Sequence, residues 1–234
     1  MDIVKKRTSS KKRLAIAIAG VMLVQNALAN DLELICPSDA PLKNILIIGD
    51  SVSKCYSSYI CEYMPKDYAV FHNKNNALDS GSGRRRLDLW IDKRHWDLVY
   101  FNFGLHDIIH DRAINTSCKD VSCKLQRTSV ENYKANLKSI LFSVKQYSSN
   151  VVYALTTPFL PDVKDSFWVS SDVPLYNAIA SEIMEGQGVP IDDLYSIVIS
   201  NLQKIQVKQD VHFTPDGCKA LANRVAQTIS GVLK

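Results

Sequence analysis

The segment NILIIGDS, residues 44–51, predicts a buried strand that turns directly into a helix. A short, uninterrupted run of Ile and Leu that ends at a glycine is typical of a strand covered on both faces of a parallel sheet. The Asp-Ser pair that follows is typical of a helix N-terminus, because both side chains accept hydrogen bonds from first-turn N–H groups. The segment therefore places the hydroxyl of Ser51 at the edge of a predicted sheet.

Four more apolar runs follow this strand, and helical patterns separate them. The runs are AVFHN (69–73), DLVYFNFG (97–104), VVYALTTP (151–158) and the weaker VPI (189–191). The clearest helix follows the capping box TSVE at 128–131, and the last helix begins at TPD, 214–216. This alternation predicts an α/β fold, namely a three-layer α/β/α sandwich with a central, mostly parallel sheet of about five strands. Folds of this kind bind ligands beyond the carboxyl ends of their strands.

The first 29 residues have the three parts of a secretory signal peptide. Residues 1–13 are basic, residues 14–24 form a short apolar core, and Ala27-Leu28-Ala29 is a small-x-small cleavage site. We therefore expect cleavage after Ala29 and export to the periplasm or the medium, with an uncleaved N-terminal anchor as the alternative. Residues 30–43 are predicted to form an N-terminal arm, and residues 44–234 a single domain.

The charge balance changes once the signal peptide is left out. The whole chain has 28 Lys and Arg and 24 Asp and Glu, and residues 1–29 contain six of the basic and one of the acidic residues. The rest of the chain therefore has 22 basic and 23 acidic residues, a net charge of about −1. Nucleic-acid-binding domains carry a basic excess that this chain lacks. We expect neither a nucleic-acid partner nor a stable membrane span after cleavage.

An even number of cysteines in an exported chain predicts disulfides. All of them follow the signal peptide, at Cys36, Cys55, Cys61, Cys118, Cys123 and Cys218. The polar segment NTSCKDVSCK favours a small loop closed by Cys118 and Cys123, and the other four cysteines allow three pairings. A zinc site built from these cysteines is disfavoured, because the chain has no C-x-x-C pair.

Three polar clusters carry candidate chemistry. Ser51 is a candidate nucleophile, which needs a base to take its proton and an acid to orient that base. Asp210 and His212 are two residues apart, so their side chains point the same way on extended backbone. Residues 104–107, GLHD, follow a predicted strand and offer a donor to a developing oxyanion. The structural alternatives are a helix cap at Ser51 and a solvated loop at Asp210 and His212.

A zinc hydrolase is a second interpretation of the GLHD region. His106, Asp107 and His110 resemble the H-E-x-x-H pattern of zinc peptidases, with Asp in place of Glu. This interpretation requires 106–110 to be helical and a third ligand from elsewhere. Gly104 interrupts a strand just before the motif, which disfavours the zinc interpretation. The candidate third ligands are His72, His95 and His212.

The order of these motifs resembles the SGNH/GDSL hydrolases. G-D-S at 49–51, G-x-x-D at 104–107 and D-x-H at 210–212 occur in the order of that family, and the resemblance covers residues 44–232. Within that family, the chain is similar to a branch that has both a G-L-H-D block and a D-V-H-F block. The resemblance implies an esterase or lipase on a flavodoxin-like sandwich, with 44–234 as the catalytic domain and no metal or cofactor. It implies Ser51 as nucleophile, His212 as base and Asp210 as the residue that orients His212.

The chain departs from the family pattern in three places. Gln209 occupies the position of the family's usual acid, three residues before His212, so Asp210 takes that role. His106 replaces the family's usual Asn in the oxyanion hole, where a neutral imidazole N–H still donates a hydrogen bond. The glycine that completes the hole, with the N–H of Ser51, is predicted to be Gly81, with Gly83 in reserve. The supporting residues are Asp50, which organises the turn, and Asp107, which fixes the loop behind His106.

These features predict an exported serine esterase that cleaves carboxylic esters through an acyl-enzyme. The expected substrates are small-molecule or glycan esters, of the acetylated-carbohydrate or lysophospholipid type. An acyltransferase acting on a cell-envelope glycan is the main alternative, and a non-catalytic envelope protein is a further one. The segment 159–172 is the predicted substrate-facing loop. Five aromatic residues are candidates to line the substrate site: Trp90, Trp96, Phe159, Phe167 and Trp168.

Overall fold

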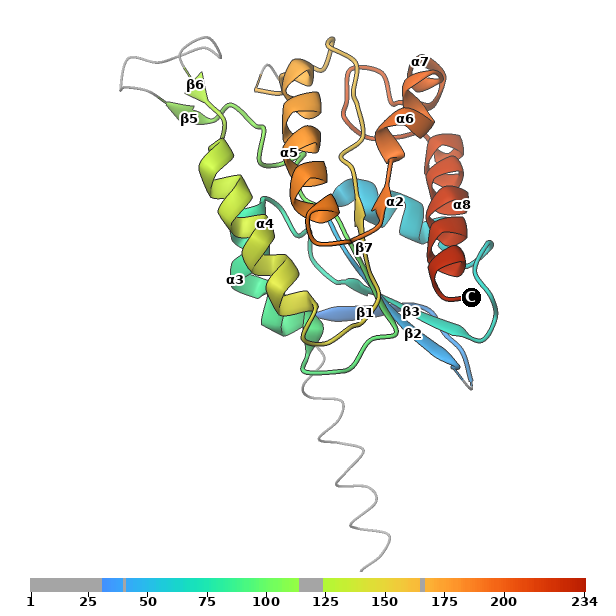
Figure 1. Cartoon of the computed structure of the whole chain (residues 1–234). Helices are drawn as coiled ribbons and strands as arrows, with labels where there is room; N and C mark the ends of the chain where they lie inside the picture. Colours follow the sequence, from blue (N-terminus) through green and yellow to red (C-terminus); the bar gives the residue numbers. More distant parts are fainter. Residues whose placement is uncertain (1–30, 40, 114–123, 165–166) are drawn as a thin grey trace, which may run out of the picture.

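The computed structural model describes residues 31–39, 41–113, 124–164 and 167–234 (Figure 1). The predicted signal peptide and the predicted Cys118–Cys123 bridge lie outside the described residues. The strands are β1 (Leu32–Cys36), β2 (Lys43–Ile48), β3 (Tyr68–Asn73), β4 (Leu98–Phe101), β5 (Arg112–Ala113), β6 (Lys124–Leu125), β7 (Val151–Ala154) and β8 (Ile191–Asp192). The helices are α2 (Ser51–Ile60), α3 (Ser80–Ile91), α4 (Val130–Val144), the 3₁₀ turn η2 (Ser170–Asp172), α5 (Val173–Glu185), α6 (Leu194–Ile199), α7 (Leu202–Ile205) and α8 (Pro215–Val232).

The central sheet confirms the predicted architecture. Its strand order is β1-β3-β2-β4-β7-β8. The five strands β2, β3, β4, β7 and β8 are parallel to one another. Counted along the chain from β2, these five have the order 2-1-3-4-5, which is the flavodoxin-like order. Each of them overlaps one of the five predicted apolar runs, although β8 shares only Ile191 with the predicted run 189–191.

The predicted N-terminal arm contributes a sixth strand to this sheet. β1 pairs antiparallel with β3, opposite residues 70–73, and a bulge between Leu34 and Cys36 shifts its register. Its side chains lie at the edge of the sheet: Cys36 is buried, Leu32 and Ile35 are partly buried, and Glu33 and Leu34 are exposed. The sequence of β1, LELIC, is mostly apolar but only five residues long, and it becomes a strand by pairing with the edge of β3.

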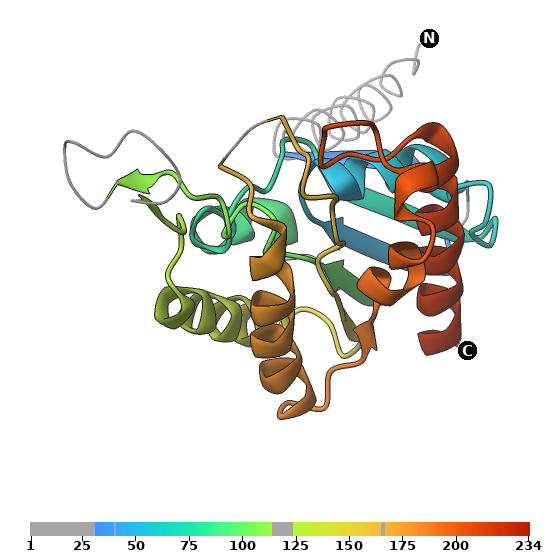
Figure 2. The same ribbon diagram turned by 90° about the horizontal axis from the view of Figure 1, so that it is seen from above.

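Helices cover both faces of the sheet (Figure 2). On one face α2 packs against α8, and α6 and α7 also contact α8. On the other face α3 packs against α4, and α4 against α5. The helix after the predicted capping box begins at Val130, with Ser129 rather than Thr128 as its N-cap, because Thr128 is buried beside Asp107.

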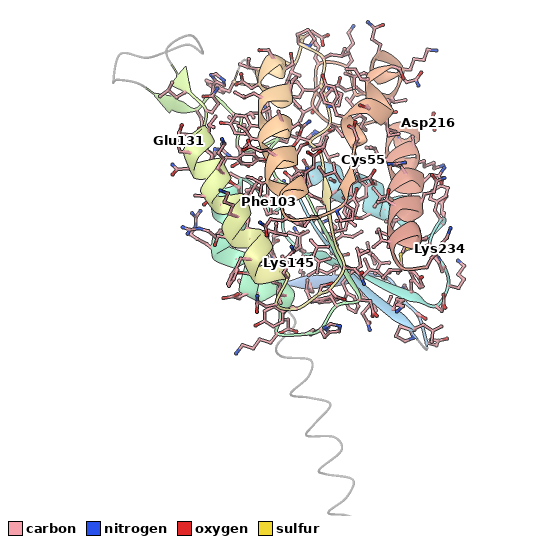
Figure 3. The ribbon with its side chains drawn as sticks, in the orientation of Figure 1. Cys55, Phe103, Glu131, Lys145, Asp216 and Lys234 are labelled. Atoms are coloured by element: carbon pink, nitrogen blue, oxygen red, sulfur yellow. A yellow bond between two sulfur atoms is a disulfide. The ribbon has the colours of Figure 1, made fainter. Side chains whose placement is uncertain are left out.

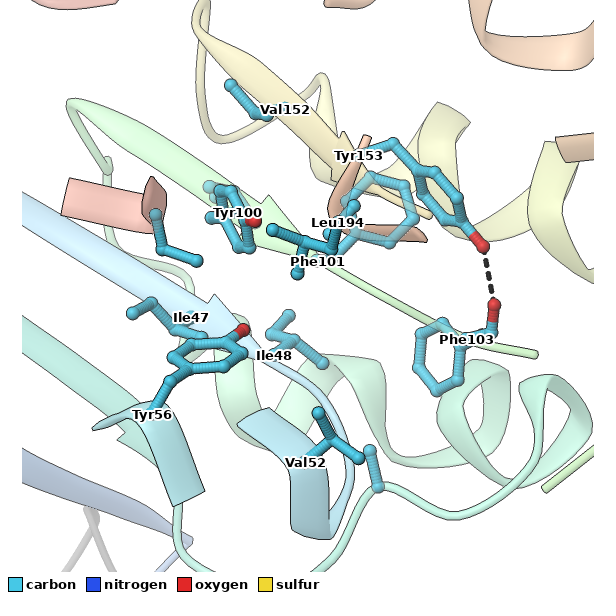
Figure 4. Close-up of a cluster of buried hydrophobic side chains, with 14 of the residues drawn as sticks. Ile47, Ile48, Val52, Tyr56, Tyr100, Phe101, Phe103, Val152, Tyr153 and Leu194 are labelled. Atoms are coloured by element: carbon cyan, nitrogen blue, oxygen red, sulfur yellow. Dashed lines mark hydrogen bonds between the residues drawn. The ribbon is translucent and has the colours of Figure 1, made fainter. Parts of the chain in front are cut away.

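Between these layers the strands are fully buried. The four residues of β4 and residues 45–48 of β2 have no exposed surface, which explains why both runs are apolar at every position. Aromatic rings fill both sides of the sheet: Tyr56 of α2 meets Tyr100 edge to face at 6.5 Å, and Phe101 meets Tyr153 at 5.0 Å (Figure 4). The hydroxyl of Tyr153 donates to the backbone carbonyl of Phe103, directly beyond β4.

The chain reverses its direction across the sheet between β2 and β4. From β2 it moves to β3 on one side, and from β3 it crosses back to β4 on the other side. In open α/β sheets this switch point is where loops diverge and a ligand finds room. Ser51 follows β2 and His106 follows β4, so both predicted site residues lie at the switch point.

Gly104 is required where the chain leaves β4. Its φ of +148° lies in a region that L-residues rarely adopt, and a Cβ there would lie 2.2 Å from the hydroxyl oxygen of Thr156. We expect Gly104→Ala to lower the free energy of unfolding by at least about 1–3 kcal/mol. Gly231→Ala is the matched control, since a Cβ at Gly231 meets nothing within 4 Å in a helix, where alanine is favoured. Urea unfolding monitored by circular dichroism tests this, and equal stabilities for both variants would contradict it.

Candidate active site

Ser51 is presented by a tight strand-to-helix turn. It is the first residue of α2, and the buried Asp50 caps the helix by accepting the N–H of Val52 at 2.9 Å. A Cβ on Gly49 would lie 2.7 Å from the side chain of Ser53, so only glycine lets the first helical turn fold this closely onto the end of β2. The G-D-S motif thus has a packing reason at its first residue and a capping reason at its second.

Asn73 holds the same turn from the neighbouring strand. Its fully buried side chain accepts the N–H of Gly49 at 2.8 Å and donates to the carbonyl of Gly49 at 2.9 Å. Both backbone groups of Gly49 are therefore satisfied without regular strand pairing, which frees the chain to leave the sheet at this point. The turn that carries Ser51 is fixed from β3 as well as from its own helix.

The structure brings Ser51, His212 and Asp210 together. Ser51 Oγ lies 2.8 Å from His212 Nε2, and His212 Nδ1 lies 2.6 Å from Asp210 Oδ1. The same carboxylate oxygen also accepts the backbone N–H of His212 at 3.1 Å. If Nδ1–H donates to Asp210, then Nε2 is free to accept the proton of the Ser51 hydroxyl. This is the arrangement in which a histidine removes a proton from a serine.

The charge of Asp210 is maintained by His212. Partial burial raises the pKa of Asp210, but hydrogen bonds from the side chain and backbone of His212 lower it more, and the net pKa lies below its ordinary value. Asp210 is therefore a carboxylate at neutral pH and stabilises a positive charge on the ring. The side chains of His212 and Asp210 are 44 and 45 % exposed, so solvent and substrate reach them directly.

The unusual D-x-H spacing works because the loop curls sharply before it. Gln209 has a φ of +58°, and Val207 donates its N–H to the carbonyl of His212 at 2.9 Å. The side-chain amide of Gln206 donates to the carbonyl of Asp210, which fixes the opposite side of the loop. Asp210 consequently reaches Nδ1 of His212 from two residues before it, at 2.6 Å.

His106 lies in a turn just beyond β4. Burial lowers the pKa of His106 and the charge of Arg127 also lowers it, whereas the nearby Asp50 raises it, and the net pKa is lower than normal. The imidazole is therefore neutral at physiological pH and has one N–H to donate. Its ring meets the ring of Trp168 edge to face at 5.9 Å, which restricts how it turns.

Asp107 joins this turn to the start of α3. Its fully buried carboxylate accepts the N–H of Ser80 at 3.0 Å and the hydroxyl of Ser80 at 2.6 Å. Burial raises the pKa of Asp107 to about 7, although hydrogen bonds from Ser80 and Thr128 lower it. The carbonyl of Asp107 accepts the N–H of Thr128 at 3.1 Å. Asp107 thus ties three segments together behind His106.

The two glycine candidates lie in the first turn of α3. Gly83 donates its N–H to the carbonyl of Asp79 at 2.9 Å, and a Cβ there would lie 2.2 Å from the ring of Phe103. Its N–H is therefore engaged in the helix and its side faces the core. Gly81 is the second residue of the helix, next to Ser80, and stays the prediction for the backbone donor.

His110 has a structural partner instead of a place beside His106. Residues 105–108 form a turn and not a helix, so the two histidines do not share a helix face. His110 Nε2 lies 2.7 Å from Asp172 Oδ2, and its Nδ1 lies 3.2 Å from the carbonyl of Lys124. Within the described residues, no three His, Cys, Asp or Glu side chains are grouped as metal ligands. The geometry that the zinc interpretation requires is therefore not formed.

Trp168 is the predicted aromatic residue that borders this site. It lies beside a cavity of about 380 Å³ whose lining residues are Val163, Lys164, Trp168, Gln209, Asp210, Val211 and His212. Trp90 and Trp96 are fully buried in the core instead, and Phe167 stacks with the ammonium of Lys124 at 3.7 Å. Phe159 is buried behind Trp168, with their rings 5.9 Å apart.

Sequence reasoning named His72 only as a candidate zinc ligand and missed its contact with a second serine, Ser53, beneath Ser51. The buried Ser53 Oγ lies 2.7 Å from Nε2 of the buried His72, whose Nδ1 lies 2.7 Å from the carbonyl of Asn73. The carbonyl of Asp50, 2.6 Å from Ser53 Oγ, is the alternative acceptor for the same hydroxyl proton. The only sequence signal was the run AVFHN, whose two polar residues end an otherwise apolar strand. These contacts support the turn from below, inside the protein.

The sequence was also silent on the pairing of four cysteines. The structure pairs Cys36 with Cys61 and Cys55 with Cys218. Figure 3 labels Cys55 among the side chains. Both bonds attach α2 to a neighbour, the first to β1 and the second to α8. The expectation of disulfides is therefore confirmed for these four residues.

Comparisons with known proteins agree with the geometry. Residues 44–225 match the GDSL-like lipase/acylhydrolase family, and the chain belongs to this family. A comparison with curated protein sequences found no match. Membership of this family makes the protein a carboxylic ester hydrolase.

Solved structures share the fold at low sequence identity. A lipase/acylhydrolase from Enterococcus faecalis superposes with a TM-score of 0.65 at 18% identity, over 82% of this chain and 98% of the other. An acetylxylan esterase from Geobacillus stearothermophilus gives 0.63 at 16% identity, over 82% and 96%. An α/β hydrolase from the metagenome of Lake Arreo, Spain, gives 0.65 at 14% identity, over 83% and 98%.

Among the described helices, none is long and apolar enough to cross a bilayer.

The buried His72 makes the stability of the protein depend on pH. Burial lowers the pKa of His72 from 6.5 to about 4, so between these values the unfolded chain binds a proton that the folded protein does not. Its contribution to stability is therefore present above pH 6.5 and is lost as the pH falls towards 4. We expect His72→Gln to reduce the fall in unfolding free energy between pH 7 and pH 4 by on the order of 3 kcal/mol.

Urea unfolding at several pH values measures this difference. The exposed His95 supplies the matched control, and His95→Gln should keep the wild-type pH dependence. A His72→Gln protein whose stability falls as steeply with acid as that of the wild type would show that another group is responsible.

Proposed function

We propose that this protein is an exported serine esterase in which Ser51 is the nucleophile, His212 the general base and Asp210 its orienting acid. The observation that carries the proposal is the continuous chain of hydrogen bonds from Ser51 Oγ to His212 at 2.8 Å and from His212 to Asp210 at 2.6 Å. These three residues come from opposite ends of the chain, 161 residues apart for Ser51 and His212. This contact between a serine, a histidine and a carboxylate at the switch point of the sheet is not needed for the packing of the fold, which supports a catalytic role.

In the proposed mechanism Ser51 attacks the ester carbonyl while His212 takes its proton. The positive ring is stabilised by Asp210, and the ring then protonates the departing alcohol, which leaves an acyl group on Ser51. Water, activated by the same histidine, attacks the acyl-enzyme and releases the acid. The reaction needs no cofactor, because each proton moves between Ser51, His212, the alcohol and water.

The negative charge of the tetrahedral intermediate requires donors on the other side of Ser51. We assign this role to the backbone N–H groups of Ser51 and Gly81 and to the ring of His106. The position of Ser51 at the N-terminus of α2 adds the favourable end of the helix dipole. The low pKa of His106 supports its assignment as a neutral donor and not as a second charged group. Asp50 and Asp107 hold the two turns that carry these donors.

The proposed export and substrate class rest on further observations. Two disulfides fit an oxidising compartment, and the N-terminal sequence has the parts of a signal peptide with cleavage near Ala29. The cavity beside His212 is open, and its lining combines Trp168 with polar side chains. This lining suits an ester of a polar alcohol, such as an acetylated carbohydrate or a lysophospholipid. The acetylxylan esterase with the same fold supports the carbohydrate alternative.

The first test removes the nucleophile and the base one at a time. In residues 30–234, purified under oxidising conditions, Ser51→Ala and His212→Ala should each lower kcat on p-nitrophenyl acetate by about 10⁴- to 10⁶-fold. Ser58→Ala is the matched control, because Ser58 lies in the same helix with an exposed hydroxyl, and it should keep wild-type activity. Activity should be indifferent to EDTA. Hydrolysis that survives in Ser51→Ala and disappears with EDTA would overturn the serine mechanism.

The second test separates donation by His106 from mere packing. We expect His106→Ala to lower kcat by about 100- to 1000-fold, which is the usual cost of one oxyanion-hole donor. His106→Asn retains an N–H donor of similar reach and should recover most of that loss. KM should change much less than kcat in both variants, because the donor acts on charge that develops during the reaction. Equal activity of the Ala and Asn variants would contradict a role in donation.

A further inference from the structure

We propose that Cys55 and Cys218 are positioning residues whose disulfide holds Ser51 in register with His212. Full activity then requires that these two cysteines are oxidised to the disulfide. The inference rests on the proposed function, because it concerns the geometry of the same site. The bond joins α2 to α8 across 163 residues of sequence, with the two Cα atoms 5.4 Å apart. These are the helices that carry, or directly follow, the two residues between which the proton moves.

The disulfide lies close to the site along both helices. Ser51 is the first residue of α2 and Cys55 is four residues later, a rise of about 6 Å along the helix. His212 precedes α8 by three residues, and Cys218 is the fourth residue of that helix. The bond therefore joins the start of the second turn of α2 to the first turn of α8.

The loop that carries His212 and the start of α8 form one stiff unit. Thr214 caps α8 by accepting the N–H of Gly217 at 3.3 Å, and its hydroxyl and N–H both donate to the carbonyl of Ile205, at 3.0 and 2.8 Å. Val207 bonds the carbonyl of His212 within the same loop. A displacement of α8 relative to α2 therefore carries His212 with it.

The reactive side chains themselves have little packing to hold them. His212 is 44 % exposed and Asp210 45 %, so neighbours surround only part of each. The hydrogen bond between Ser51 and His212 must also break and re-form during each turnover. A covalent link one turn below the site keeps the two helices aligned while that hydrogen bond is absent. Displacements of about 1 Å at a reacting pair are enough to lower a rate by about 100-fold.

The other disulfide provides a control within the same helix. Cys36 of β1 is bonded to Cys61, the C-cap residue of α2, also with the Cα atoms 5.4 Å apart. Cys61 is ten residues from Ser51, about 15 Å along the helix. Both bonds stabilise the fold by restricting the unfolded chain, but of the two only the Cys55–Cys218 bond lies within about one turn of Ser51 and joins α2 to the start of α8. Loss of stability is thus expected from either, and loss of catalytic geometry from one.

The experiment compares two double variants in the full mature chain, Cys55→Ala with Cys218→Ala and Cys36→Ala with Cys61→Ala. Both are assayed with p-nitrophenyl acetate at a temperature where circular dichroism shows them folded. We expect the first variant to lose about 10- to 100-fold in kcat with KM within about threefold of wild type. The second should keep kcat within about twofold. The rate at which a fluorophosphonate labels Ser51 should fall in parallel with kcat.

Wild-type kcat and labelling rate in the Cys55/Cys218 variant would overturn the inference, as would an equal loss in both variants. A wild type without Ser51-dependent hydrolysis would overturn the proposed function, and the inference with it. If the Cys55/Cys218 variant does not fold, partial reduction of the native wild type replaces it. Aliquots are assayed, alkylated and analysed by mass spectrometry, and activity should decrease with the fraction of Cys55–Cys218 bonds broken. Full activity in molecules that retain only the Cys36–Cys61 bond would contradict the proposal.

Discussion

The turn at Gly49 is the constraint on which the rest of the site depends. The buried amide of Asn73 satisfies both backbone groups of Gly49, so the chain leaves β2 and enters α2 without an intervening loop. The hydroxyl of Ser51 is thereby fixed to the rigid end of a parallel sheet. Because β3 supplies this amide, the turn that carries Ser51 depends on the pairing of β2 with β3. A loop of several residues at this point would leave the serine with many positions.

Around this turn the polar residues divide into a buried scaffold and an exposed reactive pair. Asp50, His72 and Asp107 are almost fully buried and make hydrogen bonds to backbone or to serine hydroxyls. Their surroundings shift their pKa values away from the ordinary range. His212 and Asp210 are nearly half exposed. The buried hydrogen bonds thus hold the geometry of the turns, and the proposed proton-transfer groups lie at the surface.

Much of the fold could be predicted because its signals are local. The five parallel strands are mostly apolar runs, since they lie between two layers of helices. The start of the last helix is indicated by Thr214-Pro215-Asp216, an N-cap followed by a first-turn proline and an acid. β1 escaped prediction because its pairing depends on the free edge of β3 and not on its own residues. The bond from Cys55 to Cys218 escaped for a similar reason, since a pairing of distant cysteines is set by which helices meet.

The sequence alone determined which residues are candidates for the site, because Ser51, His106, Asp210 and His212 follow strands or precede a helix at recognisable motifs. Their order and spacing were sufficient to indicate the family. Only the tertiary structure decided that His110 hydrogen-bonds to Asp172 instead of lying beside His106. It also decided that the N–H of Gly83 donates to the carbonyl of Asp79 within a helix. It further decided that Asp210 contacts Nδ1 of His212 from two residues before it, through the curled backbone at Gln209. Such outcomes depend on distances between residues far apart in the chain, which only the packing of helices on the sheet sets.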